Sequence, residues 1–221
     1  MASKPYTSLR SMLAAPLLTL VCATALLSGC ASTGIGKAST YKKIPSENFN
    51  SRVSIVVIHF TSANFKSSVN ILTKPSGNPV SSHYLVADPS DASYDGKKPV
   101  TYELVPETGR AWHAGRSYWR GKTGLNDQSI GIEIVNQSYC KNGDSTAEIR
   151  TGITKKVRMC FFPDYPEAQI AVVIDLLKGI QERHPNIKAI DFIGHSDIAP
   201  GRKIDPGPRF PWERLYQVGI G

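Results

Sequence analysis

The chain has 221 residues, of which 20% are charged and 41% hydrophobic, with 18 Gly and 15 Pro. This composition excludes an acidic disordered chain, a coiled coil and a collagen-like protein, and four Cys are too few for a disulfide-rich scaffold. The formal net charge of +8 indicates an anionic partner, such as nucleic acid, a membrane surface or an acidic polymer. The length allows one domain, or at most two small ones.

Residues 1–29 are typical of a bacterial secretory signal peptide. Lys4 and Arg10 precede an apolar run over 12–27, which is short for a membrane-spanning helix. The run ends in Leu27-Ser-Gly-Cys30, which resembles the lipobox of bacterial lipoproteins, where the cysteine is lipidated and becomes the new N-terminus. We therefore expect lipidation of Cys30, and the alternative is an ordinary signal peptide that happens to contain this cysteine.

A lipidated N-terminus would place residues 30–50 as a tether ahead of a domain over 51–221. The tether is rich in Ser, Thr, Gly and Lys, which is typical of a flexible linker. The lipobox resemblance also implies that Ala31 is not an inner-membrane retention signal. We expect an outer membrane lipoprotein that faces the periplasm and contacts the membrane through its N-terminal lipid anchor.

Four strands are predicted in the first part of this domain. A β-branched run over 53–60 with little alternation indicates a central strand that is covered on both faces. Further strands are predicted over 82–87, 100–105 and 129–136, the last of them strongly β-branched. The segment 88–99 is rich in turn residues.

The second part of the domain changes to a helical pattern. Apolar residues recur at steps of three and four over 166–184, which predicts a helix with Pro166 at its first position and Pro185 after its end. A last strand is predicted over 189–194, and Gly and Pro then indicate an ordered loop over 200–211. Strands mixed with one long amphipathic helix indicate a single α/β domain.

A long polar insertion over 137–163 separates the last β-branched strand from the helix, and it carries Cys140 and Cys160. An oxidising compartment permits a disulfide between them. Their pairing would close a loop of about 20 residues and stabilise the fold by roughly 3 kcal/mol. Two free thiols are the alternative, and a zinc role has less support because no histidine lies nearby in the sequence.

Two histidines stand at the ends of apolar strands. His59 lies near the end of the run over 53–60, His195 directly follows the strand over 189–194, and Asp205 comes soon after. Functional sites collect at strand ends in α/β folds, and two imidazoles plus one carboxylate are a catalytic zinc set with a position open for water. For His59 alone, a buried histidine that only satisfies its hydrogen bonds is the alternative.

Two further charged residues fit this chemistry. Lys203 and Asp205 are two positions apart and project to the same side of an extended segment, where the Lys203 ammonium would stabilise an oxyanion. Glu133 interrupts an apolar strand, and burial there would raise its pKa toward that of a general base. The alternatives are a solvated Lys203 and a Glu133 that pairs with an arginine.

Four segments carry a resemblance to a known family: Val57-Ile-His-Phe-Thr61, Ala111-Trp-His-Ala-Gly115, Ser129-Ile-Gly-Ile-Glu133 and Gly194-His-Ser-Asp-Ile-Ala-Pro-Gly-Arg-Lys-Ile-Asp-Pro-Gly207. Together they resemble the type-2 zinc N-acetylmuramoyl-L-alanine amidases, and in particular the lipoprotein members of the bacterial muropeptide amidases. The resemblance covers residues 50–216, and its last segment is the most specific.

This resemblance implies a single domain with a central mixed β-sheet flanked by helices, as in peptidoglycan recognition proteins. It implies one Zn²⁺ per chain held by His59, His195 and Asp205. Glu133 would be the general base and Lys203 the transition-state stabiliser. The reaction would cleave the amide between the lactyl group of N-acetylmuramic acid and L-alanine in peptidoglycan or (anhydro)muropeptides, for cell-wall turnover or recycling.

The substrate groove is expected to include five further residues: His83, His113, Trp119, Arg120 and Asn126. For His113, a structural hydrogen bond is the alternative, and for the basic residues it is a solvated basic face. Ser82 stands where phage-type relatives place a tyrosine, a departure that fits the glutamate-dependent branch of the family.

Two other classes of function are disfavoured. A wall-binding module without catalysis would lack a ligand, whereas all three ligands and Glu133 are present. A nucleic-acid binder would need a clustered basic helix or an aromatic–basic repeat, so we expect no nucleic-acid partner. We also expect a monomer, and no separate wall-binding domain after Trp212. The anionic partner is then a cell-wall peptide that bears carboxylates.

Overall fold

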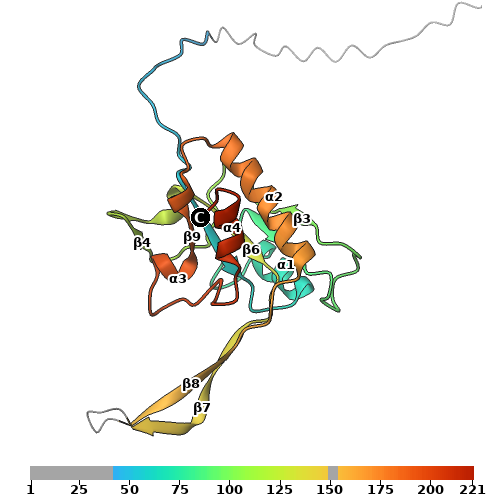
Figure 1. Cartoon of the computed structure of the whole chain (residues 1–221). Coiled ribbons are helices and arrows are strands. Elements are labelled where there is room, and N and C mark those ends of the chain that lie inside the picture. Colours follow the sequence, from blue (N-terminus) through green and yellow to red (C-terminus); the bar gives the residue numbers. More distant parts are fainter. Residues whose placement is uncertain (1–41, 149–153) are drawn as a thin grey trace, which may run out of the picture. The chain divides into compact units, whose positions relative to one another are not determined.

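The computed structural model describes residues 42–148 and 154–221 and divides the chain into two units, Met1–Ser46 and Glu47–Gly221 (Figure 1). The expected signal peptide, Cys30 and the first part of the tether lie outside the described residues, so they stay predictions. In the part of the chain that the structure describes, no helix is both long enough and apolar enough to cross a membrane.

A five-stranded sheet forms the centre of the second unit, in the order β3-β2-β6-β1-β9. Its strands are β1 (Ile55–Phe60), β2 (Tyr84–Val86), β3 (Thr101–Glu103), β6 (Ser129–Ile134) and β9 (Phe192–Gly194). All neighbours pair in parallel except β3, which is antiparallel to β2 at the edge. The central mixed sheet is therefore confirmed.

The long helix α2 (Glu167–Arg183) packs on one face of this sheet (Figure 1). Side chains alternate along β1 and β6, so every second residue points to the helix. The buried residues that meet here are Val56, Ile58, Ile130, Ile132 and Ile134 of the strands and Ile170, Val173, Leu177 and Ile180 of the helix. This cluster is the main hydrophobic core.

The opposite face of the sheet carries smaller apolar clusters, and these leave room for polar residues. Helix α1 (Phe65–Thr73) contributes Leu72, and α3 (His195–Ile198) contributes Ile198. The remaining elements are β4 (Tyr118–Trp119), β5 (Lys122–Thr123), η1 (Leu125–Asp127), η2 (Ala189–Asp191) and α4 (Trp212–Gln217). The sequence patterns did not predict α1, α3, α4 or the β4–β5 hairpin.

The last predicted strand is shorter than expected. Only 192–194 pair with β1, whereas 189–191 form a turn of 3-10 helix. The Asp191 backbone N–H donates to the Lys188 carbonyl at 2.9 Å, and the Asp191 carboxylate accepts from the Lys188 N–H at 3.3 Å. These local hydrogen bonds compete with strand pairing.

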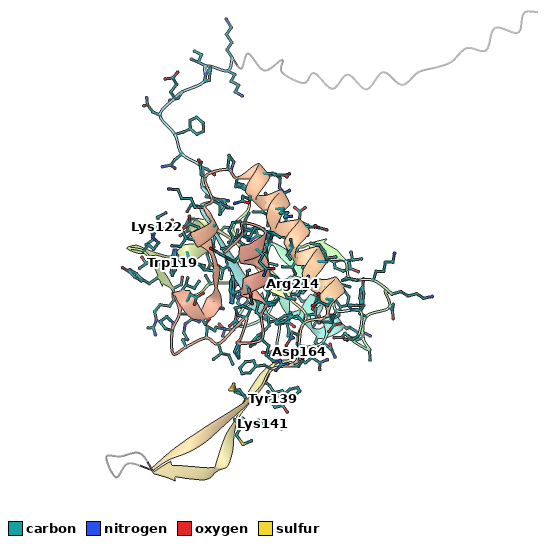
Figure 2. The ribbon with its side chains drawn as sticks, viewed as in Figure 1. Trp119, Lys122, Tyr139, Lys141, Asp164 and Arg214 are labelled. Atoms are coloured by element: carbon teal, nitrogen blue, oxygen red, sulfur yellow. A yellow bond between two sulfur atoms is a disulfide. The ribbon has the colours of Figure 1, made fainter. Side chains whose placement is uncertain are left out.

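The segment 137–163 contains a hairpin of β7 (Tyr139–Glu148) and β8 (Thr154–Phe161), which extends away from the sheet (Figure 1). Cys140 and Cys160 are direct cross-strand partners, with Cα atoms 4.0 Å apart, and form the expected disulfide. On the hairpin face that carries Tyr139 and Lys141 (Figure 2), the Lys141 ammonium lies 5.2 Å from the Tyr139 ring centre. The insertion is therefore a disulfide-linked β-hairpin.

Candidate active site

The sheet places the first two site residues side by side. His59 and Glu133 are the penultimate residues of β1 and β6, and their Cα atoms are partners in the parallel register. Both side chains point to the face opposite α2, because they alternate with the core residues Ile58 and Ile132. His195 directly follows β9 and begins α3. The site thus lies at the carboxyl ends of parallel strands, as the sequence indicated.

Asp205 reaches this edge on a loop that is held from two sides. Its carbonyl accepts the Ser196 N–H at 2.8 Å, and the Tyr165 hydroxyl donates to the Pro206 carbonyl at 2.8 Å. Asp205 Oδ2 consequently lies 2.8 Å from His59 Nδ1 and 2.9 Å from His195 Nδ1. The structure therefore brings the three predicted metal ligands together, all of them buried and with donor atoms within 4.8 Å of one another.

The hydrogen bonds around His195 favour a cation between these atoms. His195 Nε2 lies 3.1 Å from the Ala114 carbonyl oxygen, which can only accept, so the network assigns the imidazole proton to Nε2. In this tautomer, His195 turns a bare Nδ1 lone pair toward the Asp205 carboxylate. Two imidazole nitrogens and one carboxylate oxygen match a catalytic zinc set, so the residues present fit a zinc ion.

The electrostatics of the ligands agree with this fit. Burial lowers the pKa of His59 to about 4, although the neighbouring Asp205 carboxylate opposes the shift, so the imidazole is neutral at physiological pH. Burial by itself would raise the pKa of Asp205, but the close contacts of its carboxylate with the His195 and His59 imidazoles outweigh burial and hold the pKa below its usual range. A neutral imidazole and an ionised carboxylate are the forms that bind a metal.

Glu133 has the environment of a general base. Its Oε2 atom is covered, and within residues 42–148 and 154–221 it has no hydrogen-bond partner. Burial raises the pKa of Glu133 well above its ordinary value; the Asp205 charge adds to the shift and the Lys203 charge opposes it. No arginine pairs with Glu133 among the ion pairs of the described chain. A carboxylate whose pKa is raised accepts a proton from water more readily, as a general base must.

Comparison with known proteins places this site in a family. A family model described as N-acetylmuramoyl-L-alanine amidase matches residues 49–208. This chain belongs to the N-acetylmuramoyl-L-alanine amidase family. The mixed α/β fold agrees with that assignment, and so do the residues that the structure gathers at the strand ends.

Individual relatives support the family assignment. The amidase AmiD of Escherichia coli (strain K12) is 43% identical over an alignment of 207 residues that covers 91% of this chain and 67% of AmiD. AmpDh3 from Pseudomonas aeruginosa, solved with anhydromuramic pentapeptide, is 40% identical with a TM-score of 0.67 over 83% of this chain and 66% of AmpDh3. The AmiD complex with anhydro-N-acetylmuramic acid-L-Ala-D-gamma-Glu-L-Lys is 42% identical with a TM-score of 0.62, over 81% of this chain and 62% of that one. This family member thus spans about two thirds or less of these relatives.

A cleft opens beside the candidate ligands of this amidase-family chain. Glu133 and Lys203 line it together with His59, His195 and Asp205. Trp112 also lines the cleft and is 46% exposed, which marks it as a candidate substrate contact. Trp112 lies in the motif Ala111-Trp-His-Ala-Gly115, and the sequence signal for its role is a large aromatic residue beside a site histidine. Helix α1 supplies a further wall through Ile71 and Leu72.

Two of the five predicted groove residues lie around the ligand histidines. His113 lines the cleft, and its Nδ1 is 3.0 Å from His59 Nε2. Asn126 is partly buried beneath it, where its Oδ1 accepts the backbone N–H groups of His113 and Ala114 at 3.1 and 2.8 Å. Their contact with substrate stays a prediction. In the structure, His113 contacts the candidate metal ligand His59, and Asn126 holds the backbone of His113 and Ala114.

The other three predicted groove residues occupy different environments. His83 is fully buried, and its Nδ1 accepts the Gly131 N–H at 2.9 Å. Trp119 lies on the β4–β5 hairpin (Figure 2) and packs partly buried against the cluster that contains Ile55. Arg120 is exposed, with its guanidinium 3.9 Å from the Asp191 carboxylate. Among the described residues that line the cleft, His113 is the one member of the predicted set of five.

Proposed function

We propose that this chain is a zinc amidase that hydrolyses the amide between the lactyl group of N-acetylmuramic acid and L-alanine. The substrate is peptidoglycan or an (anhydro)muropeptide, in cell-wall turnover or recycling. The observation that carries the proposal is the convergence of the His59, His195 and Asp205 donor atoms in the cleft that Glu133 lines. Family membership supports it, and so do the two relatives solved with anhydromuramyl peptides.

The proposed mechanism has three participants, which are the zinc ion held by its three ligands, Glu133 and Lys203. Zinc held by His59, His195 and Asp205 would polarise the scissile carbonyl and lower the pKa of a bound water. Glu133 takes the proton of the attacking water and delivers it to the leaving amine of L-alanine. Its raised pKa allows it to hold this proton between the two steps. The Lys203 ammonium stabilises negative charge as it develops on the carbonyl oxygen.

The decisive experiment uses defined substrates. Zinc-loaded protein is incubated with isolated anhydromuropeptides and, separately, with intact sacculi, and the products are identified by mass. We expect release of a free stem peptide whose N-terminus is L-alanine. Comparison of the two substrates shows whether the anhydro form is required. Protein that binds these substrates without releasing the peptide would favour a wall-binding module and refute the amidase proposal.

The cellular location is a separate proposal that rests on the first 50 residues. Cleavage before Cys30 and lipidation of its thiol would anchor the domain to the outer membrane, facing the periplasm. Metabolic labelling with a fatty acid, followed by membrane fractionation, tests it. The parent should carry the label in the outer membrane fraction, and Cys30→Ala should carry none. Equal labelling of both proteins would refute lipidation at Cys30.

A further inference from the structure

One short segment touches both ligand histidines from behind. Residues 112–115 form a loop beside the cleft, and two of them contact the imidazole nitrogens that point away from Asp205. His113 Nδ1 lies 3.0 Å from His59 Nε2, and the Ala114 carbonyl oxygen lies 3.1 Å from His195 Nε2. The outer nitrogens of both imidazoles therefore depend on adjacent residues of one loop.

The hydrogen bonds behind His113 give this contact a direction. Ser129 Oγ lies 2.6 Å from the Leu125 carbonyl oxygen, which can only accept, so the serine donates its single proton there. Ser129 Oγ also lies 3.1 Å from His113 Nε2 and must accept the proton of that nitrogen. His113 Nδ1 is then an acceptor, and it takes the proton of His59 Nε2. The chain leaves His59 Nδ1 bare, on the side that faces Asp205.

The backbone of the loop is held in place by side chains from elsewhere in the chain. Asn126 Oδ1 accepts the N–H groups of both His113 and Ala114. Arg202 Nη2 donates to the Ala114 carbonyl at 2.9 Å and to the Arg116 carbonyl at 2.6 Å. One amide oxygen thus fixes both of the residues that face the ligand histidines.

The central strand β6 is shaped to admit the His113 ring. Gly131 lies in the middle of this strand, where glycine costs stability because it loses more backbone freedom and packs no side chain. A Cβ at this position would overlap the imidazole and lie 2.7 Å from its Nδ1. The only substituent that fits above Gly131 is hydrogen, so the strand leaves the space that His113 needs beside His59.

We propose that the loop 112–115 positions the metal ligands: His113 and Ala114 hold both imidazoles in the tautomer that leaves Nδ1 free for zinc, and Asn126 holds the loop. The inference rests on the proposed zinc site. It makes His113 and Asn126 positioning residues, which act through His59 and His195. Removal of a partner of this kind costs about 10–100-fold in metal affinity.

The test compares Asn126 with Asn136, because each of these side chains makes hydrogen bonds to loop residues. Asn126→Ala removes the shared acceptor, whereas Asn126→Asp keeps an acceptor oxygen there. Asn136→Ala is the matched control, because the Asn136 amide also bridges loop residues, Ser138 and Pro163, and contacts neither ligand histidine. The measurements are the zinc dissociation constant, from competition with a chromophoric chelator, and the melting temperature of each zinc-free protein.

We expect Asn126→Ala to weaken zinc binding about 10–100-fold. The zinc dissociation constant of Asn126→Asp should stay within about threefold of that of the parent. Asn136→Ala should lower the melting temperature and leave the zinc dissociation constant unchanged. His113→Ala should weaken zinc binding as Asn126→Ala does, and His113→Asn should recover part of the affinity, because its amide oxygen lies near the place of Nδ1. Equal zinc affinity in parent and Asn126→Ala would overturn the inference, and so would an equal loss in Asn136→Ala. A parent protein that binds no zinc would instead overturn the proposed function.

Discussion

Glu133→Gln is the substitution that examines the proposed mechanism most directly. The amide has the shape of the carboxylate but cannot take a proton from water. Glu133 Oε2 has no partner among the described residues, so the substitution breaks no hydrogen bond of that atom. The backbone register with His59 does not depend on the side chain. The substitution therefore removes the ability to accept a proton from water and leaves the fold unchanged.

The expected loss of activity follows from the role of a general base. Such a group contributes about 10²–10⁴-fold to the rate, which corresponds to about 3–5 kcal/mol of activation free energy. The loss should lie in kcat, because Glu133 acts on the water. Zinc content should stay at the level of the parent, since the donor atoms come from His59, His195 and Asp205.

Stability should respond in the opposite direction to activity. The pKa of Glu133 is raised in the folded protein, so its stabilising contribution is present below its unfolded pKa and is lost as the pH rises through the folded pKa. Glu133→Gln removes this loss. In the zinc-free proteins at pH 8, we expect the free energy of unfolding of the variant to be at least that of the parent.

The assay measures initial rates on a purified anhydromuropeptide by quantifying the released peptide, with zinc determined on the same samples. Glu103→Gln, an exposed glutamate on β3, is the matched control and should have the activity of the parent. Turnover by Glu133→Gln within about threefold of the parent would refute its role as the base. Loss of zinc from the variant would place Glu133 in the metal site instead.

Three further predictions concern the metal, the hairpin and an ion cluster at the end of α2. Chelation should abolish hydrolysis, and one equivalent of zinc per chain should restore it; activity that survives complete metal removal would contradict the mechanism. Mass spectrometry without reductant should find Cys140 linked to Cys160, and the double serine variant should keep its activity while losing up to roughly 3 kcal/mol of stability. Burial would raise the pKa of Glu107, but hydrogen bonds led by that of Arg183 lower it to about 2. The stabilising contribution of ionised Glu107 to the free energy of unfolding should be present above about pH 4.5 and fade toward pH 2. Glu107→Gln should lower the free energy of unfolding by about 1–2 kcal/mol at pH 7, as measured by denaturant titration. The expected loss is small because Arg183 is half exposed.

The local sequence pattern was sufficient to predict those strands and helices whose formation depends on contiguous residues. The β-branched run over 53–60 and the helical spacing over 166–184 are properties of contiguous residues, and the structure confirms the strand β1 and the helix α2 with shifted ends. The hairpin β7–β8 escaped prediction because its polar residues hide the strand pattern. The short α1 escaped as well, and its start depends on Asn64 and on the distant Asp91, which accepts the Phe65 N–H.

The sequence by itself determined which residues meet at the candidate metal site. His59 and His195 stand at or just beyond the ends of apolar strands, which a parallel sheet brings to one edge, and Asp205 follows in the loop after His195. Only the tertiary structure decided what lies behind them. His113 and the Ala114 carbonyl contact histidines that are 54 and 81 positions away in the chain, and Asn126 holds both residues. Gly131 is required because the His113 ring packs on it. These contacts form where separate elements pack together, so the periodicity of a local sequence segment cannot predict them.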